Sequence, residues 1–151
     1  TGRERVEPLS DFPSRLHIVD TYAAWSVTER LTLAAEADFV SRRGKPSRRS
    51  RVWAGAAYAR YRFMPAWAVA VRAEYFLDGG GLFSGTRQVL KETTLTADYH
   101  VAEGFLARAE WRRDVAGRPF FPIEISGRLS REQNTASLGL IWWFGGKKGA
   151  W

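Results

Sequence analysis

The sequence contains no cysteine, only two histidines and no long apolar run. The absence of cysteine excludes disulfide scaffolds, cysteine-containing zinc sites and thiol catalysis. With His17 and His100 as the only histidines, we expect no metal site and no cofactor. No stretch approaches the ~18 apolar residues of a membrane helix, which excludes an α-helical membrane protein but not a membrane β-barrel. A signal peptide is also lacking and the chain begins at Thr1, so we expect a processed protein or a fragment.

What is present is an aromatic-rich and basic chain of 151 residues, of which 45% are hydrophobic, 26% are charged and 14% are aromatic. This composition is ordinary for a folded domain. The formal net charge of +7 is compatible with a nucleic-acid binder, a lipid-surface binder or a protein with basic loops.

The decisive pattern is alternation with a period of two. In segment 66–78 one face is wholly apolar, from Trp67 to Leu77, and the other face carries every charge. A period of two indicates a β-strand with unlike faces. The same split recurs six more times, so we predict an all-β antiparallel fold with seven strands and no helix, at 16–27, 30–40, 51–63, 66–78, 92–101, 105–114 and 134–144.

The apolar faces favour a membrane β-barrel over a soluble sandwich. They carry small residues in the middle and aromatic residues near the ends, as in the girdles of membrane barrels. The ten steps from Trp67 to Leu77 span roughly 25 Å along the membrane normal for a strand tilted by ~40°. The predicted membrane-interface aromatics are Trp25, Trp53, Tyr61, Trp67, Tyr75, Tyr99, Trp111, Trp142 and Phe144.

The opposite faces carry charges at mid-strand. These charges would be costly in a dry core but not in a wet lumen, or on the solvated outside of a soluble sheet. Charges in a pore set its ion preference, although the same residues could simply satisfy one another and hold the strand register. The predicted pore-lining residues are Glu36, Asp38, Arg60, Arg62, Arg72, Glu74, Asp78, Glu92, Asp98, Arg108, Glu110 and Arg112.

The connections alternate between short and long, which is typical of periplasmic turns and external loops. The short ones lie at 27–29, 64–66 and 102–104, and the long ones at 41–50, 79–87 and 115–131. Three-residue turns predict that Asp98 lies opposite Arg108 and that Tyr58 lies opposite Arg72.

The organisation that we predict is a single β-barrel segment. Residues 1–13 form an external loop or an N-terminal extension, residues 14–144 contain the strands and residues 145–151 form a tail. The first and the last strand both run inward. Because a bacterial barrel has an even strand count, we expect the C-terminal part of a larger barrel, completed by N-terminal strands or by another chain.

Three motifs carry a family resemblance. They are R-x-E-Y-F-x-D at 72–78, T-L-x-x-x-Y at 94–99 and R-x-E-x-R-x-D at 108–114, followed by a last strand that ends on the aromatic Phe144. Over residues 51–144 the chain resembles the C-terminal half of the OmpL-like β-barrel porin-2 family of outer-membrane porins. The resemblance implies a bacterial outer-membrane location. The last strand, ending at Phe144, also resembles the signal that the barrel-assembly machinery reads.

We therefore expect a channel for the passive diffusion of small hydrophilic solutes through a charged lumen. Two alternatives stay open: a non-conducting structural or partner-binding barrel subunit of an envelope complex, and a soluble basic β-protein that binds an anionic partner. The expected partners are outer-membrane lipid, lipopolysaccharide and the barrel-assembly machinery, and no nucleic acid is expected because no nucleic-acid motif accompanies the basic run at 42–51.

Four other features of the sequence give weaker evidence of function. The basic run is either a solvated loop or a contact for lipid-A phosphates. The glycine-rich segment 79–85 is explained by turn chemistry, since no P-loop continuation follows it. The segment 119–123 either folds inward or caps the rim. Asp98 and His100 share a face, but no serine is fixed near them by spacing, so no enzymatic activity is expected.

Overall fold

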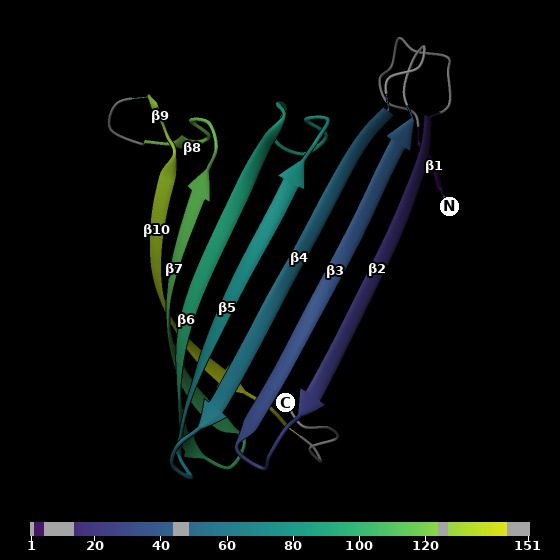
Figure 1. The fold of residues 1–151 in the computed structure, drawn as a ribbon. Coiled ribbons are helices and arrows are strands. Elements are labelled where there is room, and N and C mark those ends of the chain that lie inside the picture. Colours follow the sequence, from purple (N-terminus) through teal and green to yellow (C-terminus); the bar gives the residue numbers. More distant parts are fainter. Residues whose placement is uncertain (1, 5–13, 44–48, 124–126, 145–151) are drawn as a thin grey trace.

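The computed structural model describes residues 2–4, 14–43, 49–123 and 127–144, which form one large antiparallel sheet and a small hairpin. Seven long strands follow one another in chain order across the sheet (Figure 1). They are β2 (Ser14–Ser26), β3 (Leu31–Arg43), β4 (Arg49–Arg62), β5 (Trp67–Asp78), β6 (Gln88–Ala102), β7 (Phe105–Ala116) and β10 (Glu132–Trp142). The prediction of an antiparallel all-β fold with seven such strands is confirmed.

Three short strands lie at the loop end of the sheet. Strand β1 (Gly2–Glu4) pairs with the start of β2, and β8 (Phe121–Pro122) pairs with β9 (Leu129–Ser130) between β7 and β10. Most of the loop expected at 1–13, the middle of the basic run and the tail expected at 145–151 lie outside the described residues. The described part of the chain holds no helix capable of crossing a membrane.

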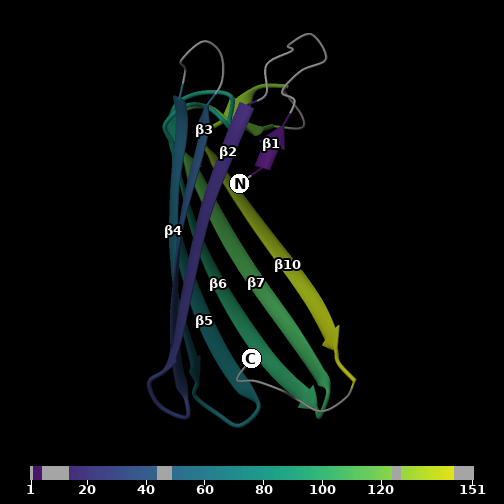
Figure 2. The same ribbon diagram turned by 90° about the vertical axis from the view of Figure 1, so that its right-hand side faces the viewer.

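The sheet is curled, with one concave and one convex face (Figures 1 and 2). Within the described residues it does not close, because β2 and β10 lie toward opposite sides of the strand order and are not paired with each other. Seven antiparallel strands in sequence also make β2 and β10 run in the same direction. They therefore cannot pair antiparallel with each other.

The strand register matches the register predicted from the turns. Tyr58 lies opposite Arg72, and Asp98 lies opposite Arg108. The turn between β6 and β7 is nevertheless shorter than predicted, because Ala102 already pairs with Phe105. A register irregularity between His100 and Ala102 adds back the residue that the shorter turn omits. The alternation of faces is thereby preserved.

Strand β6 begins four residues before its predicted start. The predicted segment began at Glu92, whereas the strand begins at Gln88. Lys91 is the reason that the alternation is hard to see here, since it places a charge on the otherwise apolar convex face, opposite Tyr75. A lysine near the edge of an apolar band is tolerated because its long stem lets the ammonium group reach water.

The convex face carries aromatic side chains in two belts. The turn-side belt contains Trp67 beside Tyr99, with ring centroids 4.7 Å apart, and Phe105 beside Trp142 at 5.1 Å. In the loop-side belt the rings of Phe39 and Trp53 lie 4.4 Å apart. All nine predicted interface aromatics lie on this face, with exposed fractions from 38% to 88%.

The belts cross the strand register obliquely. Trp25 on β2 and Trp111 on β7 belong to one row of paired residues, yet Trp25 lies in the turn-side belt and Trp111 in the loop-side belt. From Trp25 to Trp142 the turn-side belt shifts by six residues over six strand steps. One residue per strand corresponds to a strand tilt of about 35°, which is the tilt of closed barrels.

Candidate functional site

Burial in this sheet is inverted relative to a soluble protein. In the described part of the chain eleven buried side chains face the concave side, and six of them are polar or charged: Asp78, Gln88, Glu92, Thr94, Asp98 and Asp114. Most of the exposed large apolar side chains lie on the convex side instead. The concave face, with its hydrogen-bonded charges, is therefore the candidate functional site.

Pairing places basic and acidic side chains in adjacent rows. Arg72 and Arg112 lie in one row with Thr94 between them. Two residues further toward the loops, Glu74, Glu92 and Asp114 form the next inward-facing row. Because successive inward positions are two residues apart, each arginine side chain reaches a carboxylate of the neighbouring row.

Arg72 is the centre of a loop-side network. Its Nε donates to Tyr58 Oη at 3.0 Å, and Tyr58 Oη in turn donates to Glu36 Oε2 at 2.8 Å. The guanidinium group also pairs with Glu74 and Glu92, and it lies 4.0 Å from Glu36 Oε1. One arginine thus ties strands β3, β4, β5 and β6 together.

Arg112 extends the same network to the last strand. Its Nη2 lies 3.1 Å from Glu92 Oε2 and 2.8 Å from Asp114 Oδ1. Thr94 Oγ1 donates to Glu92 at 2.7 Å, and Gln133 Nε2 on β10 donates to Asp114 at 3.5 Å. The network thus joins β3, β4, β5, β6, β7 and β10, and its two arginines face four carboxylates.

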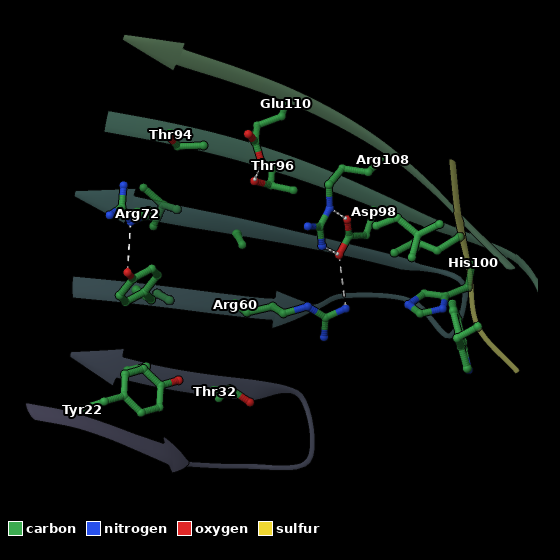
Figure 3. Close-up of a pocket in the computed structure, with 18 residues that line it drawn as sticks. Tyr22, Thr32, Arg60, Arg72, Thr94, Thr96, Asp98, His100, Arg108 and Glu110 are labelled. Carbon is green, nitrogen blue, oxygen red and sulfur yellow. Dashed lines mark hydrogen bonds and ion pairs between the residues drawn. The ribbon is translucent and has the colours of Figure 1, made fainter. Parts of the chain in front are cut away.

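A second group lies nearer the turns (Figure 3). Arg108 binds Asp98 through two hydrogen bonds, from Nε at 2.8 Å and from Nη2 at 3.1 Å. Arg60 reaches the same carboxylate from the other side, with Nη2 3.5 Å from Oδ2. The group borders a hollow of about 620 Å³ on the concave face. Arg62 lies at the rim and donates to the backbone oxygen of Glu29 at 2.9 Å.

Asp78 differs from the other predicted pore-lining residues. It is 0% exposed, and its carboxylate accepts hydrogen bonds from the backbone amides of Leu82, Phe83 and Ser84 and from Ser84 Oγ. Asp78 lies beyond the loop-side belt, and although burial alone would raise its pKa, these hydrogen bonds outweigh that effect and lower it. Its charge therefore organises the loop and is not presented to the hollow.

The other eleven predicted pore-lining residues lie at concave-facing positions of their strands. Glu110 accepts a hydrogen bond from Thr96 Oγ1 at 3.1 Å, whereas Asp38 lies directly opposite another acid, Asp20. The prediction omitted Tyr58 and Asp114 from the site. Both lie on the charged side of their alternating segments, so the signal was present in the pattern, and Tyr58 was missed because only charged residues were counted.

At the loop end of the sheet, the β5–β6 loop and the β7–β10 connection bring phenylalanines to the edge of the loop-side network. Phe83 packs edge-on against Phe76, with ring centroids 5.8 Å apart, and Phe120 packs against Phe121 at 5.3 Å. These four rings border a hollow of about 290 Å³ that Arg112 and its carboxylate partners also line. Within the described residues, no group of three or more candidate ligands is arranged to hold a metal ion.

Comparison with known proteins identifies the family. The family model described as putative β-barrel porin-2, OmpL-like, matches residues 2–144, which is nearly the whole chain. No curated protein and no solved structure matches the chain. The chain belongs to the OmpL-like β-barrel porin-2 family.

Proposed function

We propose that this member of the OmpL-like β-barrel porin-2 family forms the wall of an outer-membrane channel through which small hydrophilic solutes diffuse passively. The observation that carries the proposal is the inversion of the sheet, with exposed tryptophans and tyrosines outside and buried carboxylates inside. An apolar band between aromatic belts suits lipid. A face of ion pairs suits water-filled space, because a dry core would impose a large desolvation cost on the same charges.

The mechanism follows from how the charges are held. Arg72 and Arg112 are fixed by several carboxylates each, so they keep their positions when a solute passes. Fixed charges of both signs on one wall create a transverse field that orients polar solutes and biases the passage of ions. The proposal assigns no catalytic step and no cofactor to the chain.

A water-filled channel needs a closed wall. We propose that further strands, from another part of the protein or from another chain, pair with β10 and with the part of β2 that β1 leaves unpaired. Because these two strands run in the same direction, an all-antiparallel closure takes an odd number of added strands. Lipopolysaccharide around the basic loop, and the assembly machinery at the closing strand, are the further partners that we propose.

Conductance in planar lipid bilayers tests the function. The full-length protein, shown to be folded by a heat-dependent shift on gels, is added to one side of the bilayer in 1 M KCl. We expect discrete conductance steps that scale with KCl concentration, as diffusion through a water-filled pore requires. A folded, inserted protein that gives no steps above those of a detergent-only control would contradict channel function and favour a structural barrel.

A further inference from the structure

The two arginine groups of the concave face differ in how completely their charge is neutralised. In the loop-side network Arg72 faces three carboxylates, and Arg112 binds two. In the turn-side group Arg60 and Arg108 share the single carboxylate of Asp98, whose side chain is only 4% exposed. Glu110 also attracts Arg108 from the same face, so Arg60, for which the 3.5 Å contact with Asp98 is the one ion pair among the described residues, is the least neutralised arginine of the group.

The charge of Arg60 is accessible from the hollow. The side chains of Arg60 and Arg108 are 37% and 39% exposed, so their remaining N–H groups face open space. Arg60 binds Asp98 at one nitrogen only, and the longer distance of 3.5 Å leaves this guanidinium free to reorient toward a second acceptor.

Apolar side chains form the adjoining wall of the same hollow. Leu106, Ile141 and Trp143 line it beside the arginines. These three residues are inward-facing, because Leu106 pairs with Ile141 across β7 and β10 and Trp143 lies two residues further along. A hollow with an exposed, weakly paired arginine and an adjacent apolar surface offers complementary contacts to an anion that carries an apolar body.

We propose that the Arg60–Asp98–Arg108 group and this apolar wall form a binding step for small monocarboxylates with an apolar body. The carboxylate contacts Arg60 and Arg108 from the side opposite Asp98, and the apolar body packs on Leu106, Ile141 and Trp143. The inference rests on the proposed function in one respect, since a solute reaches the hollow through the water-filled lumen. A dianion such as phosphate is disfavoured, because the carboxylates of Asp98 and Glu110 line the same hollow and repel a second negative charge.

Equilibrium titration calorimetry in detergent micelles tests the site without requiring conduction. Benzoate, acetate, benzamide and inorganic phosphate are titrated separately into the full-length protein. We expect benzoate to bind more tightly than acetate, which lacks the apolar body, and more tightly than benzamide, which lacks the charge. Phosphate should bind no more tightly than acetate.

Two substitutions separate the site from a general charge effect. Arg60→Gln leaves the two hydrogen bonds between Arg108 and Asp98 in place, and we expect it to weaken benzoate binding about tenfold, as the loss of one charge-assisted contact implies. The matched control is Arg113→Gln, which removes a positive charge from the convex face, where Arg113 pairs with Glu132, and should leave binding unchanged.

Equal benzoate affinity of Arg60→Gln and wild type, or phosphate binding as tight as benzoate, would overturn the inference. If the protein conducts but does not bind benzoate, the binding site is contradicted and the channel function is not. If it binds benzoate but does not conduct, only the channel function is contradicted.

Discussion

At the scale of single residues, the concave face is organised by arginines that each serve several carboxylates. Glu92 shows why this matters, since it is 7% exposed and depends on Arg72, Arg112 and Thr94 for compensation. A buried carboxylate that loses its cation keeps the desolvation cost without the attraction that offset it. The sequence alone predicted the pairing of Tyr58 with Arg72, because opposed residues follow from turn length. It could not predict with which carboxylates Arg72 would form ion pairs, because a long side chain reaches several neighbouring positions.

Arg72→Ala should therefore destabilise the folded protein strongly. We expect a loss of about 2–4 kcal/mol in the free energy of unfolding, because Glu74 and Glu92 lose a shared partner that is itself partly exposed. Urea unfolding in lipid vesicles measures it. The double variant Arg72→Gln with Glu92→Gln removes both charges and should recover part of the loss. A loss below about 0.5 kcal/mol in the single variant would show that the network contributes little.

Asp78 holds the loop between β5 and β6, and its removal should free that loop. Asp78→Ala deletes the acceptor of three backbone amides, which are left without it. We expect tryptic cleavage after Arg87 to become at least several-fold faster, while the strands stay protected. The lowered pKa of Asp78 means that its contribution is present above about pH 4 and is lost as the pH falls further, so the assay at pH 8 observes it in full. Ser84→Ala, which removes one hydrogen bond to Asp78, should give a smaller increase. Unchanged cleavage in the Asp78 variant would refute the loop-holding role.

At the scale of elements, alternation predicted every long strand and which face each residue takes. Strand ends were less predictable, because Lys91 interrupts the apolar face within β6. The bulge between β6 and β7 was not predictable either, since a three-residue turn and a two-residue turn with a bulge give the same register beyond them. Gly104 is the residue that decides between these forms, because it has φ of +77°.

Gly104→Ala should weaken the contact between the β6–β7 turn and the end of β10. An added Cβ would lie 2.9 Å from the backbone oxygen of Trp143, whose amide donates to the Gly104 oxygen at 3.0 Å. Together with the positive φ, we expect a cost of about 1–3 kcal/mol. Gly139→Ala on β10 is the matched control, because nothing lies within 4 Å of its added Cβ. The two variants are compared by urea unfolding in lipid vesicles. Equal stability of the two variants would argue against this contact.

At the scale of the whole molecule, the oblique belts are the feature that the sequence did not reveal. Alternation placed Trp25 and Trp111 on the same face, but their membership of different belts depends on the tilt of about 35° across the sheet. The tilt results from a shift of one residue at each of six strand pairs, and no single turn determines it. The consequence is a continuous apolar band on the convex face and a charged concave face.

Cysteine labelling tests most directly whether the concave face meets water and the convex face meets lipid, because the sequence contains no native cysteine. Single cysteines are introduced on adjacent residues, at inward positions Ala70→Cys and Thr96→Cys and at outward positions Val71→Cys and Leu95→Cys, and each folded variant in lipid vesicles is exposed to a charged, membrane-impermeant thiol reagent. We expect labelling at residues 70 and 96 and protection at residues 71 and 95. Labelling at 71 and 95 with protection at 70 and 96, or equal labelling of all four, would contradict a wall with water inside and lipid outside.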